Sequence, residues 1–109
     1  GKTEKEKKKL LKDSKILEEA GVFAIVLECI EKKLSKKITE TIEIPTIGIG
    51  SSKFCDGQIL VTDDLLGLTK SKIKFVKKYA NFKINIRNAV KKFGSDVKRG
   101  SYPSLKHSY

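Results

Sequence analysis

Three short apolar runs alternate with amphipathic stretches, and this alternation limits the possible folds more than any other feature of the chain. The runs cover residues 22–27, 44–50 and 58–62. Continuous apolar strands with β-branched residues are typical of parallel sheets in which both faces are covered. Strands that alternate with helical segments indicate parallel βα units. The sequence therefore predicts an α/β fold built around a parallel sheet.

Four segments show the spacing of apolar residues that is typical of helices. The first begins with a capping box, in which Thr3 is the N-cap and Glu6 reaches back to it. Gly21 is placed to end this helix in a left-handed conformation. The predicted helices cover residues 4–20, 31–41, 71–80 and 83–98, and a short tail follows Gly100.

The length of the chain sets a limit on how this sheet can be completed. The 109 residues are enough for one domain with a modest core. An isolated three-stranded parallel sheet leaves two apolar edges open, and a complete (βα)8 barrel takes about 250 residues. We therefore expect either one piece of a barrel or a sheet that another chain completes.

The chain is strongly basic, with a formal net charge of +11, which favours polyanions as partners. However, only Arg87 and Arg99 are arginines, and lysines are spread over every helical segment. Base reading and bidentate phosphate contacts favour arginine, so we interpret the lysines as solvated helix faces and expect no nucleic-acid partner. No apolar run is long enough to span a membrane, and no signal-peptide pattern is present. We therefore expect a cytoplasmic protein without a membrane partner.

The cysteines and the single histidine offer little for a metal site or for nucleophilic catalysis. Cys29 and Cys55 form no C-x-x-C pair, and His107 lies in the tail. A Cys/His zinc site is therefore not expected, and both thiols are expected to be free in a reducing compartment. Cys29 has no histidine near it in sequence, so we interpret it as a small buried apolar residue rather than a nucleophile.

A carboxylate ends the first apolar run, because Glu28 follows the unbroken stretch Phe23–Leu27. A buried carboxylate without a partner is costly. The side chain is either satisfied by a helix N-terminus or a lysine, or it is a general base strengthened by apolar surroundings. Strand ends carry the chemistry in βα barrels. The spacing alone leaves both interpretations open.

Glycines and aspartates near the second and third runs offer three further candidates. Gly48 and Gly50 could cradle a phosphate, but the third glycine of a dinucleotide fingerprint is missing, and a tight exit from the strand is favoured. Asp56 precedes a glycine, which is typical of a structural turn. Asp63 and Asp64 could bind a divalent cation, although a helix cap or a solvated turn is favoured.

Several stretches, taken together, resemble one enzyme family. They are the opening GKTEKEKKKLLKDSKILEEAG, then AGVFAIVLECI, IPTIGIGSSKFCDGQILVTDDLLGL, KFVKKYAN and the closing YPSLKHSY. The motifs LEC, IPTIGIG, CDGQ-x-L and HSY occur here in the order and spacing of the C-terminal half of ketopantoate hydroxymethyltransferases (3-methyl-2-oxobutanoate hydroxymethyltransferases). The resemblance covers nearly all of the chain.

The resemblance implies a fold and a reaction. The fold is a (βα)8 TIM barrel of the phosphoenolpyruvate/pyruvate type, and residues 1–109 would form its C-terminal part, about strands six to eight with their flanking helices, with the N-terminal half absent. The reaction transfers a hydroxymethyl group from 5,10-methylenetetrahydrofolate to 3-methyl-2-oxobutanoate and gives ketopantoate for pantothenate and coenzyme A biosynthesis. Besides these small-molecule substrates, the resemblance implies Mg²⁺ as cofactor and a homo-oligomer when the enzyme is full length.

One functional residue of the family matches a position in this chain. The glutamate of LEC, the proton acceptor of the family, corresponds to Glu28. The magnesium ligands and other substrate-binding residues are implied to lie in the N-terminal half, so the chain alone is expected to be inactive. Ile30-Glu31 stands where the family usually has proline, and Ser51-Ser52 where it has Ala-Gly, which changes two loops on the catalytic face. The alternative function is a basic, non-catalytic binding or assembly module.

Overall fold

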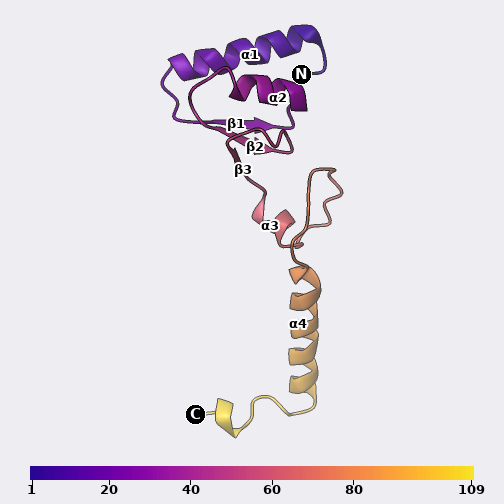
Figure 1. Cartoon of the computed structure of the whole chain (residues 1–109). Helices are drawn as coiled ribbons and strands as arrows, with labels where there is room; N and C mark the ends of the chain where they lie inside the picture. Colours follow the sequence, from indigo (N-terminus) through magenta and orange to yellow (C-terminus); the bar gives the residue numbers. More distant parts are fainter. The chain divides into compact units, whose positions relative to one another are not determined.

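The sheet consists of three parallel strands in the order β1-β2-β3. A computed structural model describes all residues, 1–109, and places the strands at Ile25–Glu28 (β1), Thr46–Ile49 (β2) and Gly57–Gln58 (β3). The helix α2 (Lys32–Thr39) connects β1 to β2 (Figure 1). The predicted parallel βα arrangement is therefore confirmed, whereas a closed barrel is not part of this chain.

The chain divides into two units, which we describe separately. The first comprises residues 1–60 and 73–76, and the second comprises residues 61–72 and 77–109. The first unit contains the sheet with α1 (Glu4–Glu19) and α2. The second contains α3 (Thr62–Leu65), α4 (Phe82–Lys98) and a 3-10 helix, Leu105–His107.

The helix α1 forms where its end signals predict it. Thr3 Oγ1 accepts a hydrogen bond of 3.2 Å from the backbone N–H of Glu6, and the Glu6 carboxylate accepts one of 3.1 Å from the N–H of Thr3. This reciprocal pair satisfies N–H groups that have no partner within the helix. Gly21 follows the helix with a φ of 84°, a left-handed conformation that glycine adopts without steric cost.

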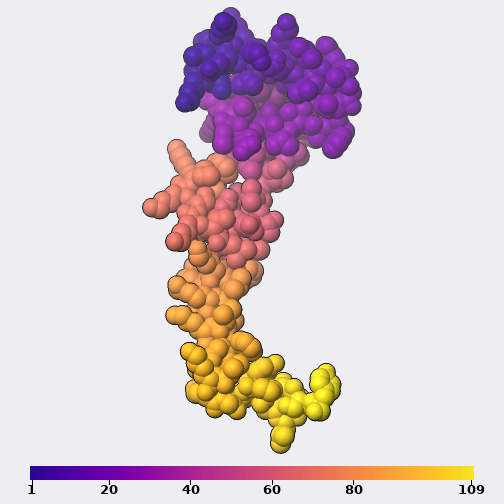
Figure 2. Space-filling model, turned by 180° about the vertical axis from the view of Figure 1, so that it is seen from behind, coloured from indigo at the N-terminus to yellow at the C-terminus, as the bar shows by residue number.

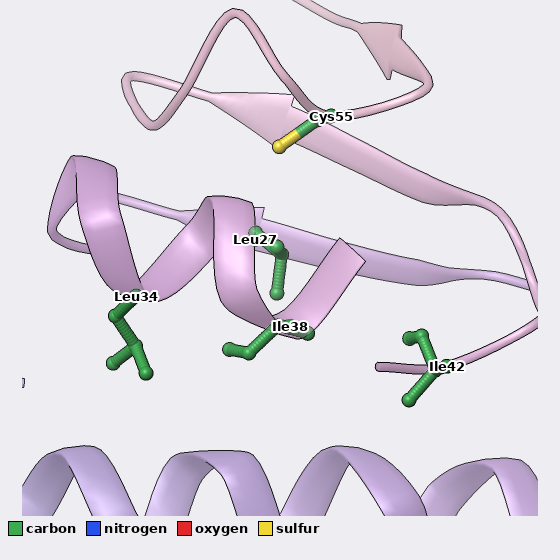
Figure 3. Close-up of a cluster of buried hydrophobic side chains, with 5 residues drawn as sticks. All are labelled: Leu27, Leu34, Ile38, Ile42 and Cys55. Atoms are coloured by element: carbon green, nitrogen blue, oxygen red, sulfur yellow. The ribbon is translucent and has the colours of Figure 1, made fainter. Parts of the chain in front are cut away.

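The core of the first unit lies between the sheet and its two helices. It contains five buried side chains: Leu27, Leu34, Ile38, Ile42 and Cys55 (Figure 3). Leu34 and Ile38 project from α2 toward α1, whose Leu10 and Leu11 pack against the cluster. The four-residue spacing of Leu34 and Ile38 places both on this one face of α2, and Ile42 joins them from the segment that follows the helix.

β1 is covered on only one face, which corrects the prediction that both of its faces are buried, whereas β2 confirms the prediction of a buried strand, because Thr46, Gly48 and Ile49 are all buried. Leu27 points to the helices and is 5% exposed, but Val26 is 56% exposed and Glu28 is also exposed. Residues one apart in a strand face opposite sides, so Val26 and Glu28 share the side away from the core. Both helices of this unit lie on the other side of the sheet (Figure 1).

Two further element predictions are wrong. The third strand is limited to two residues, and Thr62, predicted to end that strand, opens α3 instead. No helix forms over residues 71–80. There the backbone N–H of Tyr79 donates to the carbonyl of Leu65 at 2.8 Å. Bonds to a distant part of the chain replace the local bonds of a helix, which helical periodicity cannot report.

The helix α4 confirms the last predicted helix, and Gly100 follows it with a φ of 70°. None of its side chains is buried, including the apolar ones, which are Phe82, Ile84, Ile86, Val90, Phe93 and Val97. Figure 2 shows its side chains, in orange, on the visible surface. None of the helices in the chain is both long and apolar enough to cross a membrane.

Candidate active site

Glu28 is the last residue of β1 and lies at the carboxyl end of the parallel sheet, in register with Ile49 of β2. Its side chain is exposed on the uncovered face. Within residues 1–109 the carboxylate forms no hydrogen bond or ion pair, so neither a helix N-terminus nor a lysine of this chain satisfies it.

The turn after Glu28 has an unusual backbone conformation. Cys29 adopts a φ of 53°, the only positive value at a residue other than glycine. Its N–H donates to the carbonyl of Ile49 at 2.9 Å, which ties the turn to the end of β2. The Cys29 side chain is exposed, which corrects the expectation that it is buried. A non-glycine residue in this region costs about 1–3 kcal/mol, so the surrounding contacts must hold the turn.

Residues after the turn begin α2. The Glu31 carboxylate accepts hydrogen bonds from the backbone N–H groups of Lys33 at 3.0 Å and Leu34 at 3.1 Å. These two bonds, first the one from Lys33, lower the pKa of Glu31. Ile30 packs against the core cluster. The chain is thus anchored on both sides of Cys29, by Leu27 before it and by Ile30 and Glu31 after it.

The loop after β2 lies beside this turn. Gly50 has a φ of 61°, and a Cβ atom there would overlap the ring of Phe75. A Cβ atom on Gly48 would lie 2.8 Å from the side-chain oxygen of Gln58. No helix begins after these glycines. These contacts support the interpretation that the two glycines allow a tight exit from β2, rather than the alternative of a phosphate-binding loop.

Two serine hydroxyls connect the loop after β2 to the start of α2. The hydroxyls of Ser35 and Ser51 lie 2.5 Å apart. Ser35 Oγ also lies 3.0 Å from the Glu31 carbonyl, and Ser51 Oγ lies 3.3 Å from the Ile30 carbonyl. In the sequence, Ser51 is notable only as a departure from the family pattern, and nothing there distinguishes Ser35 from a serine on the surface of a helix.

Asp56 performs more than the structural turn that the sequence predicts. Its Oδ2 accepts hydrogen bonds from Thr46 N at 2.8 Å and from Thr46 Oγ1 at 3.0 Å. The Thr46 hydroxyl lies 2.8 Å from that of Thr39 in α2, and Thr46 is fully buried. The Thr46 N–H, followed by its hydroxyl, lowers the pKa of Asp56. The carboxylate thus fixes the start of β2 to the loop before β3.

The remaining sequence candidates lie in the second unit. Asp63 and Asp64 lie in the first turn of α3, where Thr69 donates a short hydrogen bond to Asp64. His107 is in the 3-10 helix, and its Nδ1 lies 2.8 Å from the hydroxyl of Ser104. Nowhere in the chain do three or more His, Cys, Asp or Glu side chains converge as they would around a metal ion.

Comparison with known proteins decides the family. A family model described as ketopantoate hydroxymethyltransferase matches residues 1–105, which is almost the whole chain. The chain belongs to the ketopantoate hydroxymethyltransferase family.

Curated relatives support this assignment over the full chain. The 3-methyl-2-oxobutanoate hydroxymethyltransferase of Pelagibacter ubique is 58% identical over 109 residues, which are 100% of this chain and 42% of the relative. Relatives with the same name from Clostridium botulinum (strain Langeland) and Syntrophus aciditrophicus are 54% and 48% identical over 110 residues, 100% of this chain and 40% of each relative. These relatives carry the name of an enzyme, and this chain spans about two-fifths of their length.

Removing the Asp56 charge is expected to change how the stability of the folded chain depends on pH. The Thr46 hydrogen bonds hold the pKa of Asp56 in the folded state below its ordinary value of 3.8. A lowered pKa stabilises the folded state above the unfolded-state pKa, and this contribution is lost as the pH falls through the folded-state pKa. Asp56→Asn is therefore expected to lower the Tm at pH 7, and the difference from wild type should shrink below about pH 3.8.

Thermal unfolding followed by circular dichroism between pH 2 and pH 7 measures this difference. Glu43→Gln is the matched control, because Glu43 is exposed three residues before β2 and its side chain forms no hydrogen bond or ion pair. A Tm difference between wild type and Asp56→Asn that stays constant down to pH 2 would contradict the prediction.

Proposed function

We propose that this chain forms the C-terminal part of the (βα)8 barrel of a ketopantoate hydroxymethyltransferase, about strands six to eight with their flanking helices. Three features support this proposal. The strands are parallel, and α1 and α2 cover one face of the sheet, as helices cover the outside of such barrels. β1 and β3 each have an unpaired edge, which a closed barrel removes. The curated relatives are more than twice as long.

The reaction of the complete enzyme, by which we mean the enzyme of full family length that contains this chain, begins with loss of a proton. 3-Methyl-2-oxobutanoate carries a hydrogen on the carbon next to its keto group. Removal of this proton leaves a nucleophilic carbon, which bonds to the methylene carbon of 5,10-methylenetetrahydrofolate. Water supplies the oxygen of the new hydroxymethyl group, and tetrahydrofolate leaves as the second product. The product is ketopantoate, a precursor of pantothenate and coenzyme A. Glu28 is the group in this chain that accepts the proton.

The position of Glu28 is the observation that carries this assignment. It is an exposed carboxylate at the carboxyl end of a parallel strand, on the sheet face that the helices leave open. In barrels of this class, chemistry takes place at the carboxyl ends of the strands. Val26 lies two residues earlier on the same face.

Mg²⁺ is the cofactor implied by the family resemblance, but the residues of this chain do not form a site for it. No three carboxylate, imidazole or thiol groups converge here, whereas Mg²⁺ is held by oxygen ligands. We therefore assign the magnesium ligands to the rest of the complete enzyme and no step of the reaction to this ion. We also propose that the complete enzyme is a cytoplasmic homo-oligomer acting on small molecules, without a nucleic-acid or membrane partner.

Product formation by the complete enzyme tests the proposed function. The purified enzyme is incubated with 3-methyl-2-oxobutanoate and 5,10-methylenetetrahydrofolate, and ketopantoate is measured by mass spectrometry. We expect product only when both substrates are present. A folded enzyme that forms no ketopantoate, but binds polyanions with a steep dependence on salt, would contradict the proposal and favour the basic binding module.

A further inference from the structure

We propose that Ser51 and Ser35 form a hydroxyl bridge that positions Glu28 for proton transfer. This inference rests on the proposed function of Glu28. Neither residue forms a hydrogen bond with the Glu28 side chain, so both are positioning residues. The bridge joins the loop after β2 to α2 and residues 30–31 at the carboxyl end of the sheet, and it fixes the backbone shortly after the proposed base.

The bridge connects the loop after β2 to residues 30–31 whichever of the two hydroxyls donates its proton to the other. The two hydroxyls have one proton each. In the first arrangement, Ser51 donates to Ser35 across 2.5 Å and Ser35 donates to the Glu31 carbonyl across 3.0 Å. In the second, Ser35 donates to Ser51, which donates to the Ile30 carbonyl across 3.3 Å. Either arrangement connects the loop after β2 to residues 30–31.

The bridge lies largely out of contact with water. Ser35 is 0% exposed, and Ser51 is half-buried. Loss of the Ser51 hydroxyl removes its contacts with the Ser35 hydroxyl and the Ile30 carbonyl, while the Ser35 hydroxyl keeps the Glu31 and Ile30 carbonyls as acceptors within its own segment. The bridge is therefore a specific connection between the two segments rather than a surface contact.

The backbone between the bridge and Glu28 explains why the carboxylate responds to it. Cys29, the next residue, is held at a φ of 53°, a conformation that relaxes when its surroundings loosen. Leu27 is packed in the core before the turn, and the bridge is hydrogen-bonded to the carbonyl groups of residues 30–31 after it. If the second anchor is lost, Cys29 can return to a favourable conformation, which rotates the backbone that carries Glu28. General-base catalysis requires the carboxylate within hydrogen-bond reach of the proton.

Ser51→Ala in the complete enzyme tests the bridge. We expect kcat for ketopantoate formation to fall about fivefold to tenfold, the order of one hydrogen bond, while KM changes less than twofold. Amide hydrogen exchange in a peptide covering residues 28–35 should accelerate by a similar factor. Ser51→Thr keeps the hydroxyl and should restore both quantities toward wild type. Retention of wild-type kcat and amide exchange in Ser51→Ala would overturn the proposal.

Ser52→Ala is the matched control. Ser52 is a buried serine in the same loop, and its hydroxyl accepts a hydrogen bond of 3.2 Å from Phe54 N without contacting residues 30–31. We expect this variant to leave the exchange of residues 28–35 unchanged. If Ser52→Ala lowered kcat and accelerated that exchange as much as Ser51→Ala does, a general loosening of the loop would explain the results and the bridge proposal would fail.

A Glu28→Gln background separates the bridge from the proposed function. If Ser51 acts through Glu28, adding Ser51→Ala to Glu28→Gln should cause no further fall in the exchange of the substrate hydrogen next to the keto group. A further fivefold to tenfold fall would overturn the positioning role. If Glu28→Gln alone left substrate exchange unchanged, the role of Glu28 would fail, and accelerated amide exchange in Ser51→Ala would still support the bridge between the two segments.

Discussion

Glu28→Gln in the complete enzyme is expected to slow removal of the substrate proton by a factor of about 10²–10⁴, the usual contribution of a positioned general base. Glutamine has nearly the same shape as glutamate but cannot accept a proton at neutral pH. The loss should therefore appear in kcat rather than in substrate binding. Exchange of the hydrogen next to the keto group of 3-methyl-2-oxobutanoate with deuterated water, followed by NMR, measures this step without the folate substrate.

Glu43→Gln is the control for this experiment. Glu43 is an exposed glutamate that precedes β2, at the opposite end of the sheet from Glu28, and its carboxylate has no partner. This variant loses the same charge from the same unit, so it should exchange the substrate hydrogen at the wild-type rate. Exchange by Glu28→Gln within threefold of wild type, with normal folding, would exclude Glu28 as the proton acceptor.

Gly50→Ala is expected to lower the free energy of unfolding of the chain by about 2–5 kcal/mol. A left-handed conformation costs an L-residue about 1–2 kcal/mol, and Gly50 has a φ of 61°. The added Cβ atom would also overlap the ring of Phe75, and overpacking of this kind costs about 1–3 kcal/mol. Urea unfolding followed by far-UV circular dichroism measures the change, as a lower midpoint with a similar slope.

Gly94→Ala is the matched substitution with the opposite expected sign. Gly94 lies inside α4, and an added Cβ atom would meet no atom within 4 Å. Alanine is favoured over glycine inside a helix by about 0.5–1 kcal/mol, so this variant should stabilise α4. Equal stability changes in the two variants would show that Gly50 is not restricted by its conformation and its contact with Phe75.

The sequence predicts the features of this chain that depend on neighbouring residues. The capping box of Thr3 and Glu6, the left-handed Gly21 and the helical spacing in α4 each act over one or two turns, and the structure confirms all of them. The alternation of apolar runs with helices predicts the parallel sheet. The same alternation places Glu28 at a strand end, because a strand that leads into a helix ends where the apolar run ends.

Features that depend on distant residues are missed or predicted wrongly. Helical periodicity favours a helix over residues 71–80, but the N–H of Tyr79 bonds to the Leu65 carbonyl instead. Asp56 appears in the sequence as part of a turn, yet its carboxylate binds Thr46, ten residues earlier. No local pattern specifies either pairing, since each depends on how the chain folds back on itself.

The sequence by itself thus determined the order of the elements, the ends of α1 and α4, and the family to which the chain is similar. Only the tertiary structure decided which face of the sheet stays open, that Glu28 lies on that face without a partner, and that Ser35 meets Ser51 beside it. The physical reason is the separation along the sequence between the residues that interact. Caps and periodicity are set by bonds between residues a few positions apart, whereas burial and side-chain bridges arise only when distant segments pack together.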